Sequence, residues 1–484
     1  MSIPLGTLVS MNNPQAPQGS ATDHSNFEHV DPVQFEDALA RFKSLSIESG
    51  TTATIARAPG RLDVLGGVAD YSGSLVMEGT LAVGTWVAMQ PATHGEIRIS
   101  SVTKSGTKPF SATVPLSMIV EHRTLVPIEK ASANLTSVKS MRWTAYLVGT
   151  IYLLLSDGFI DLADFNGCNL FVYSDVPIGA GVSSSAALEV AAARAVAGAY
   201  RVDIDGMSLA SLCQRVENTI VGAPCGLMDQ VTCCLGREGA LLELDCRPHN
   251  LLGYSELPKD WKIVGIDSGV KHSVGGISYG KARTAAFMGL EILRQSEVSV
   301  GDYLCNLDAE SWNDAKHFLP EVISAADFEN QYGLLSDPVS KILNGENYYV
   351  RSCAEHPILE NIRVRRLKEI LSATNQSSTI DQIMEAGELM LESHRSYSDR
   401  VQLGCEETDI LVSIAMSYAN HGIHGAKITG GGSGGTVAVL GYGDIENIIE
   451  EIRKEYTSRT GRQTQKMDGS SPGAWAFGVI SRKI

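Results

Sequence analysis

Three glycine-rich stretches set the main limits on how this chain of 484 residues can fold. The second stretch, Pro177 to Glu189, follows an apolar strand pattern and precedes an alanine-rich helix. Glycines let the backbone approach a ligand closely, and the N-terminus of a helix attracts anions. The stretch therefore favours a phosphate cradle between a strand and a helix. The alternative is an N-capped helix after a flexible turn.

The spacing within this second stretch excludes two common nucleotide motifs. It reads PIGAGVSSSAALE and contains no GxxxxGK[ST], so a Walker-type P-loop is excluded. It contains no GxGxxG either, so a dinucleotide site is not indicated. Its serines can cap the helix or bind Mg²⁺.

The other two stretches predict turns around a ligand. The first, Pro59 to Gly73, puts an arginine and an aspartate around a tight glycine turn. A strand-turn-strand with a solvated ion pair is the alternative. The third, Lys427 to Val439, has five glycines in six positions between two apolar strand patterns. This context favours a loop shaped for close backbone approach over a linker.

An acidic loop lies between the second and third stretches. A predicted helix ends at a Gly/Pro break after Glu217, and a new segment begins with Asp229. The two carboxylates are too far apart for one helix face, but they can converge across the loop. Surface carboxylates without a function are the alternative for each.

Strand and helix patterns alternate along most of the chain, with no internal repeats. We expect a disordered tail over residues 1–25, an N-terminal domain over 26–252 and a C-terminal domain over 253–484. A composition change between Pro248 and Lys259 marks the boundary. An opening helix is expected over residues 32–45, and a last strand over the segment AWAFGVI, residues 474–480.

Charge and cysteine usage exclude several classes of protein. The charge sum of 39 − 55 = −16 argues against nucleic-acid or anionic-membrane surfaces. The N-terminus lacks the features of a signal peptide, and no apolar run is long enough to span a bilayer. Nine cysteines without a CxxC pair indicate reduced thiols. We therefore expect a cytoplasmic protein, monomeric or weakly oligomeric.

All of these motifs, in this order, resemble the GHMP small-molecule kinase superfamily, specifically its galactokinase branch. The similarity spans residues 27 to 484 and includes the segments ESHRS and SYGKAR. Within this branch, four segments resemble the kinase region of plant arabinokinases in particular: GRLDVLGGVADYSGS, VENTIVGAPCGLMDQ, GIDSGVKHSVGGISY and CAEHPILENIRVRR.

The resemblance implies an α+β, two-domain GHMP kinase fold with the active site in the cleft between the domains. The N-terminal domain would hold a mixed sheet and the phosphate loop, and the C-terminal domain would be a ferredoxin-like α/β unit. It also implies ATP and Mg²⁺ as cofactors and a small-molecule sugar as the partner.

The resemblance also assigns residues to roles. Asp229 matches the catalytic base, and Arg61 matches the arginine that stabilises this carboxylate and the transferred charge. Ser185 and Glu217 match the Mg²⁺ ligands. The ATP-binding residues it implies are Gly179, Ala180, Gly181, Val182, Ser183, Ser184, Ser185 and, from a weaker segment match, Trp143. The sugar-binding residues it implies are Asp70, with Gly67, Val68 and Ala69 of the same loop, and, from other parts of the chain, Gly226 and Tyr279.

One departure from the galactokinase pattern bears on the sugar. Where galactokinases have Gly-Glu-His-Thr-Asp, this chain has Gly66-Gly67-Val68-Ala69-Asp70. In the family the Glu and His face the C6 hydroxymethyl end of the sugar, and Gly67 and Val68 cannot replace their hydrogen bonds. L-Arabinopyranose has the galactose ring configuration without C6, so a site lacking these partners leaves no polar group unpaired. The alternative is that the loop only changes shape and galactose still binds.

We therefore expect an enzyme that phosphorylates L-arabinose at its anomeric hydroxyl. The alternatives are a galactokinase, another sugar 1-kinase such as a glucuronokinase, or a non-catalytic sugar sensor on the same scaffold. The basic run Arg363, Arg365, Arg366 and Lys368 would be needed for a nucleic-acid binder, but a solvated helix face is the commoner meaning of such a run.

Overall fold

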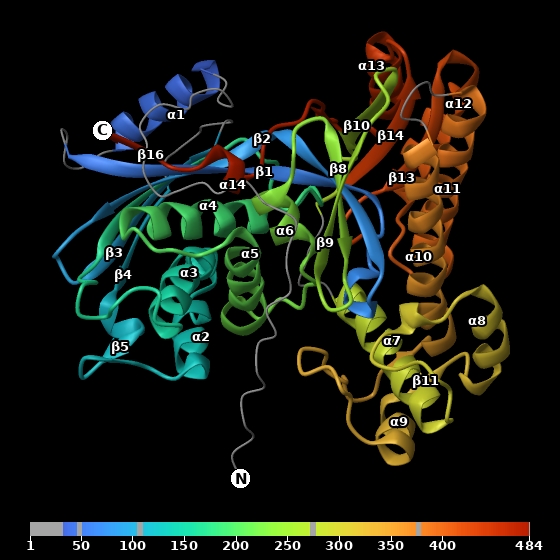
Figure 1. Cartoon of the computed structure of the whole chain (residues 1–484), viewed down its shortest axis with the longest axis horizontal. Helices are drawn as coiled ribbons and strands as arrows, with labels where there is room; N and C mark the ends of the chain where they lie inside the picture. Colours follow the sequence, from blue (N-terminus) through green and yellow to red (C-terminus); the bar gives the residue numbers. More distant parts are fainter. Residues whose placement is uncertain (1–31, 46–50, 104–109, 272–276, 374–378, 484) are drawn as a thin grey trace.

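The structure, a computed structural model, describes residues 32–45, 51–103, 110–271, 277–373 and 379–483. The tail expected over residues 1–25 lies outside the described residues. The described strands form two main β-sheets with helices packed on them (Figure 1). Two further pairs of short strands are β5 (Val120–Glu121) with β6 (Thr124–Leu125), and β11 (Ile323–Ser324) with β12 (Asn347–Tyr348).

The larger sheet has eight strands and is built around one long strand, β2 (Leu75–Pro91). One edge of β2 pairs with β1 (Thr52–Leu65), while its other edge pairs with β8 and then with β7. Only β3 and β7 run parallel; the other pairs are antiparallel. The remaining strands are β3 (Glu96–Thr103), β4 (Phe110–Pro115), β7 (Cys168–Ser174), β8 (Ala240–Asp245), β9 (Asn250–Glu256) and β16 (Ile480–Lys483).

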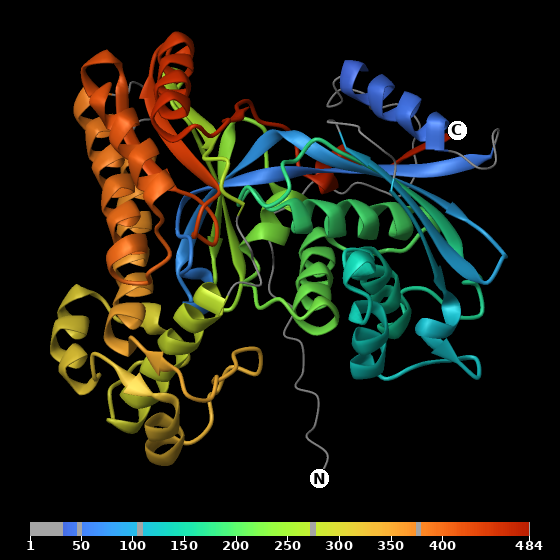
Figure 2. The same cartoon turned by 180° about the vertical axis from the view of Figure 1, so that it is seen from behind.

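Helices cover both faces of this sheet. On one face, α4 (Ser184–Ala199) lies against β1 and β2, where its many alanines are fully buried and allow close packing. On the opposite face, the predicted helix over residues 32–45 is confirmed as α1 (Figures 1 and 2). The other helices on the α4 side are α2 (Ile128–Thr136), α3 (Thr144–Ser156), α5 (Gly206–Arg215) and α6 (Met228–Leu235).

The second sheet has the order β13-β14-β10-β15, with all pairs antiparallel. Its strands are β10 (Trp261–Asp267), β13 (Ile423–Ile428), β14 (Thr436–Tyr442) and β15 (Lys466–Met467). Helices α11 (Ile380–Asp399) and α12 (Glu406–Ser417) pack on this sheet, and α13 (Glu446–Thr460) packs on α12. A long helix, α10 (Val350–Ala373), runs beside α11 and reaches β2 of the first sheet.

A smaller group of helices lies at the end of α10 that is remote from the second sheet (Figures 1 and 2). It consists of α7 (Ile277–Gln295), α8 (Ala309–Ala315) and α9 (Ala325–Tyr332). Helix α7 packs along α10, and their apolar residues join one hydrophobic cluster with Val68 and Tyr71 of the first stretch. This cluster ties the first glycine-rich stretch to α7, which carries Tyr279.

The predicted last strand over residues 474–480 is wrong. Residues Ala474–Phe477 form a short helix, α14, and the strand β16 begins only at Ile480. Phe477 of α14 packs edge-on against Trp86, with ring centroids 5.4 Å apart. A short apolar run carries no periodicity that separates a buried strand from a buried helical turn. Here the packing against β2 decides.

The predicted helix that ends at the Gly/Pro break after Glu217 is interrupted. It ends as an α-helix at Arg215 and continues as a π-helical turn, Val216–Val221, that carries Glu217. Such turns are rare and recur at functional sites. Within the described ranges, each helix is too short or too polar to cross a bilayer.

Candidate active site

Arg61 and Asp229 meet although they are 168 residues apart in the chain. Arg61 lies near the end of β1 with 2% of its surface exposed, and Asp229 lies in the first turn of α6. Nε and Nη2 of Arg61 both donate to Asp229 Oδ1, at 2.9 and 2.8 Å. Asp229 keeps 25% of its side chain exposed. The carboxylate is therefore held by a buried cation and still open to a ligand.

The second glycine-rich stretch reaches the same carboxylate. Nη1 of Arg61 donates to Gly181 O at 2.8 Å, and Ser183 Oγ donates to Asp229 Oδ2 at 2.6 Å. Gly181 has a φ of 72°, in the left-handed region that favours glycine. Ser183 precedes the first residue of α4, so the loop opens at a helix N-terminus, where backbone N–H groups lack helical partners. The predicted phosphate cradle and the predicted base thus share one corner of the molecule.

The third glycine-rich stretch supports the second one. A Cβ atom added at Gly430 would lie 2.5 Å from Gly181 O, and one at Gly435 would lie 2.8 Å from Ala180 O. Thr436 Oγ1 also donates to Ala180 O at 2.7 Å. The two loops therefore meet through their main chains, and the glycines are needed because no side chain fits between them.

The side chain of Asp70 lies directly against the backbone of Gly226. A Cβ atom at Gly226 would lie 1.6 Å from Asp70 Oδ2, so only glycine leaves room for this carboxylate. Burial and the nearby Asp229 raise the pKa of Asp70 to about 6, while Arg283 opposes the shift. Tyr279 is buried beside Tyr71, with ring centroids 6.3 Å apart. These predicted sugar contacts therefore gather near Asp229.

Replacing Gly226 by alanine should remove sugar binding while the fold persists. The added methyl group must displace the carboxylate of Asp70, and we expect a loss of about 100-fold in kcat/KM for the sugar, as for other displacements of about 1 Å. Steady-state kinetics measure this loss. Gly280→Ala in α7 is the matched control, because a Cβ there meets nothing within 4 Å. Equal behaviour of the two variants would contradict the placement of Asp70 in the sugar site.

Helix α10 supports the loop between β1 and β2. His356 Nε2 donates to Gly67 O at 3.0 Å, and Glu360 Oε1 accepts from Gly66 N at 3.1 Å. The Nδ1 atom of His356 then accepts from Ser396 Oγ. Burial lowers the pKa of His356 to about 4, which keeps this neutral tautomer in place. Two hydrogen bonds thus fix the loop that leads to Asp70, and a third holds His356 itself.

The loop itself is buried. Gly67 has no room for a side chain, because a Cβ atom there would lie 2.0 Å from Tyr397 Oη and 2.1 Å from Asp63 Oδ2, both of which are buried. Val68 has a φ of 58°, which is unusual for a β-branched residue, and both it and Ala69 are fully packed. Strained positions of this kind cluster at ligand sites.

Glu217 and Ser185 are also together. Ser185 at the start of α4 lies close enough to the Glu217 side chain to oppose the rise of its pKa, and Gln230 Nε2 donates to Glu217 Oε2 at 2.9 Å. Burial and Asp229 raise the pKa of Glu217 to about 7. Its Oε1 atom is buried and has no hydrogen-bond partner among the described residues. An orphaned carboxylate oxygen beside a hydroxyl group fits a hard cation such as Mg²⁺.

One predicted residue lies apart from these contacts. Trp143 precedes α3, and its ring packs edge-on against Phe110 with centroids 5.2 Å apart. Four buried groups of the site were not predicted: Glu78 and Asp63 behind Arg61, and Glu189 and Gln230 beside Glu217. Their place in the site becomes visible only when the fold brings distant segments of the chain together. The signal in the sequence was a charged residue within an otherwise apolar strand or helix, as at Glu78 and Glu189.

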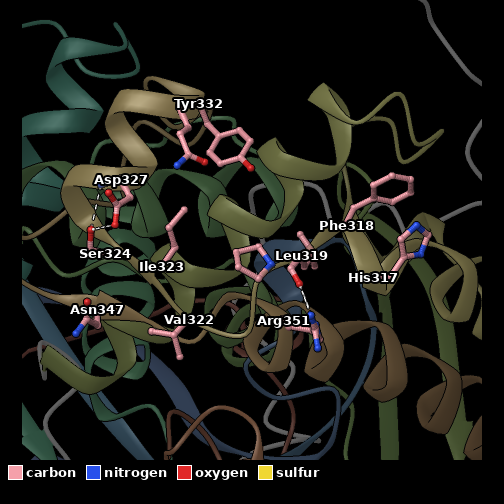
Figure 3. Close-up of a pocket in the computed structure, with 12 residues that line it drawn as sticks. His317, Phe318, Leu319, Val322, Ile323, Ser324, Asp327, Tyr332, Asn347 and Arg351 are labelled. Carbon is pink, nitrogen blue, oxygen red and sulfur yellow. Dashed lines mark hydrogen bonds between the residues drawn. The ribbon is translucent and has the colours of Figure 1, made fainter.

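An open pocket of about 590 Å³ lies elsewhere, between η6 (Lys316–Phe318), β11, α9 and the start of α10. Figure 3 shows Arg351 and Asp327 turned to neighbours in its own wall. Arg351 donates to Leu319 O, and Asp327 accepts from Ser324 Oγ. Its lining residues include none of the predicted site residues, so the site around Asp229 is a separate place.

Comparisons with known families match three parts of the chain. The GHMP kinases N terminal domain matches residues 145–237, and the GHMP kinases C terminal domain matches residues 378–458. The galactokinase galactose-binding signature matches residues 41–91. The first match contains Ser183 and Asp229, and the third contains Arg61 and Asp70.

Comparisons with individual proteins agree. The chain is 35% identical to L-arabinokinase of Arabidopsis thaliana over 88% of its own length, and spans 46% of that longer protein. It is 30% identical to a galactokinase of Chloroflexus aggregans, covering 85% of this chain and 90% of the relative. The solved galactokinase of Lactococcus lactis complexed with galactose superposes with a TM-score of 0.69 at 20% identity, covering 93% of this chain and 100% of that one.

The fold is shared more widely. Mevalonate kinase of L. major, solved in complex with R-mevalonate, superposes with a TM-score of 0.51 at 14% identity, covering 88% of this chain and 98% of that one. The expected fold class is thereby confirmed. The matched N and C terminal domains and the galactokinase relatives show that the chain belongs to the GHMP kinase family, as a sugar kinase of the galactokinase and arabinokinase type.

Proposed function

We propose that this chain transfers the γ-phosphate of ATP to the anomeric hydroxyl of L-arabinose, giving L-arabinose 1-phosphate and ADP. The observation that carries the chemistry is the Asp229 carboxylate, held by Arg61 and Ser183 at the mouth of the glycine loop. Phosphoryl transfer needs positioned groups and charge neutralisation more than covalent catalysis.

In this proposal Asp229 is the general base. A sugar hydroxyl is a poor nucleophile until its proton is removed, and Asp229 Oδ2, bonded to a hydroxyl donor already, can accept that proton. Arg61 occupies the other oxygen and keeps the carboxylate oriented. Asp70 would accept a hydrogen bond from a second sugar hydroxyl, and Tyr279 and Gly226 would shape the pocket around it.

The nucleotide would be held by main-chain atoms. The backbone of Gly179 to Ser185, with the start of α4, offers N–H groups and the positive end of a helix dipole to the phosphates. Trp143 would contact the adenine. Ser185 and Glu217 would hold Mg²⁺, which shields the charge of the β- and γ-phosphate oxygens. Arg61 adds a buried positive charge next to the same loop.

The sugar is assigned from Gly67 and Val68. A side chain at 67 has no room, because its Cβ would lie about 2 Å from Tyr397 Oη and Asp63 Oδ2, so position 67 itself offers no polar side chain to C6. The likeness to L-arabinokinase supports the same assignment. The galactose-binding signature favours galactose as the second candidate.

A three-sugar assay tests the assignment. We expect kcat/KM for L-arabinose to exceed that for D-galactose by about 10-fold or more, because a pocket without C6 partners gains nothing from the hydroxymethyl group. D-Glucuronate should be poorer still. Coupled ADP release gives the rates, and phosphorus NMR shows which hydroxyl is modified. A preference for galactose would overturn the arabinose assignment and leave the kinase chemistry standing.

We also propose a division of the chain into domains 26–252 and 253–484. The change of sheet between β9, which ends at Glu256, and β10, which begins at Trp261, supports two domains with the boundary a few residues later, since residues 252 and 253 both lie within β9. The final strand, β16, returns to the first sheet beside β1.

A further inference from the structure

Two buried carboxyl groups face each other behind Arg61. Asp63 of β1 and Glu78 of β2 are directly opposed in the antiparallel ladder, and both are 0% exposed. Opposed residues point to the same face of a sheet, and like charges in such pairs destabilise it. A buried carboxylate without compensation is far more costly than an exposed one. Two ionised groups at these positions would therefore be a severe conflict.

The charges around this pair do not balance. Lys427 Nζ lies 2.8 Å from Asp63 Oδ2, and Arg61 Nε lies 3.2 Å from Glu78 Oε2. Arg61 already pairs with Asp229. The titratable and charged groups that face Glu78 are Arg61, Asp63, Asp229, Lys427, Tyr397, Cys233 and Cys246. Ionisation of all three acids would set three negative charges against two positive ones.

Three buried carboxyl oxygens of this pair lack hydrogen-bond partners among the described residues, which indicates that one of the two groups carries a proton. Glu78 Oε1, Glu78 Oε2 and Asp63 Oδ1 have no hydrogen-bond partner within the part of the chain that the structure describes. Buried polar atoms are almost always paired, so orphaned atoms need an explanation. One proton on Glu78 would give Asp63 Oδ1 a donor. It would also bring the summed charge of Arg61, Lys427, Asp63, Glu78 and Asp229 to zero. Burial and the neighbouring Asp63 also raise the pKa of Glu78 well above its usual value.

We propose that Asp63 and Glu78 share one proton and form a positioning pair for Arg61. The neutral carboxyl group of Glu78 packs against the guanidinium and fixes it, without drawing its charge away from Asp229. Asp63 meanwhile anchors Lys427, whose strand leads into the third glycine loop. This inference rests on the proposed function, because it assigns Arg61 and Asp229 their roles in the transfer.

Infrared spectroscopy tests the shared proton directly. A protonated carboxyl group has a carbonyl stretching band that a carboxylate lacks, and the difference spectrum between wild type and Glu78→Gln at neutral pH should show its loss. Glu243→Gln is the matched control. Glu243 is also a buried acid of the same sheet, but it pairs with Lys368 at 2.6 Å and should contribute no such band. A Glu78→Gln difference spectrum without the band would overturn the proposal.

Kinetics test the positioning role. Glu78→Ala should lower kcat by about 10- to 100-fold, with KM for ATP and sugar within about twofold of wild type, because Arg61 loses its support. Glu78→Gln should rescue kcat to within about threefold, since a carboxamide keeps the shape and the donor of a neutral carboxyl. If Glu78→Ala keeps wild-type kcat, or if Glu78→Gln falls as far as Glu78→Ala, the positioning role is wrong.

The two proposals can fail separately. The infrared measurement needs no turnover, so it decides the shared proton even in a chain without sugar kinase activity. Absence of that activity in the wild type would instead refute the proposed function. Intact activity together with an unprotonated Glu78 would refute only the inference about the pair.

Discussion

Replacement of Asp229 by asparagine should lower kcat for sugar phosphorylation by about 10²–10⁴-fold, the usual contribution of a general base. Asparagine keeps the shape of the side chain and can still accept from Arg61, but it cannot take the proton of the sugar hydroxyl. We expect KM for ATP to change little, because in the proposed function the glycine loop binds the nucleotide through its own backbone. Coupled ADP release measures the rate, and phosphorus NMR confirms the product.

The matched control for this variant is Asp245→Asn. Asp245 has a similar exposure, 23% of its side chain against 25% for Asp229, and it also pairs with an arginine, Arg247, at 3.1 Å. It lies on β8 outside the site. Asp245→Asn should therefore keep wild-type kinetics. Nearly full turnover of Asp229→Asn would show that another group accepts the proton.

Replacement of Arg61 by methionine should damage both catalysis and stability. The variant leaves Asp229 without its cation and Gly181 O without its donor. Breaking a buried pair by removing one partner costs about 3–5 kcal/mol, and the partial exposure of Asp229 places the effect at the lower end. We expect kcat to fall by about 10²–10³-fold as well, the usual cost of removing one preorganised donor.

Urea unfolding and steady-state kinetics measure the two effects of Arg61→Met separately. Arg215→Met is the control, since Arg215 also binds an aspartate, Asp157, at 2.6 Å but is 48% exposed. Exposed ion pairs contribute about 0–1 kcal/mol, so this control should unfold close to wild type. If the two variants lose equal stability, the Arg61–Asp229 pair is no stronger than a surface pair.

The parts of the site that the sequence predicts are those defined by neighbouring residues. The phosphate loop follows this rule: an apolar strand, a glycine turn and an alanine-rich helix are contiguous, and β7, the loop and α4 form as expected. Helix α1 is another such case, because one amphipathic segment defines it. The meeting of Arg61 and Asp229 could be inferred only through the family resemblance, since 168 residues separate them.

The parts that could not be predicted depend on strand register. The β1–β2 ladder has register shifts between Pro59 and Arg61 and between Asp63 and Leu65. Each shift changes which residue of β2 faces which residue of β1, so the opposition of Asp63 and Glu78 follows from irregularities that leave no clear pattern in the sequence. Helix α14 could not be predicted for a related reason, because its helical turn depends on packing against Trp86, which lies far away in the sequence.

The loops around Gly181 and Gly430 meet through their main chains. In the proposed function, the part of the site for the phosphate donor can therefore stay the same in evolution while the part for the sugar acceptor changes. The side chains that reach Gly181 O and Ala180 O at this contact are those of Arg61 and Thr436, and neither lies in the loop of residues 66–70 that leads to the sugar side. Residues around Asp70 can therefore drift from one sugar to another while the nucleotide half stays constant. The same fold can thus change its sugar substrate while the loops proposed to bind ATP stay unchanged.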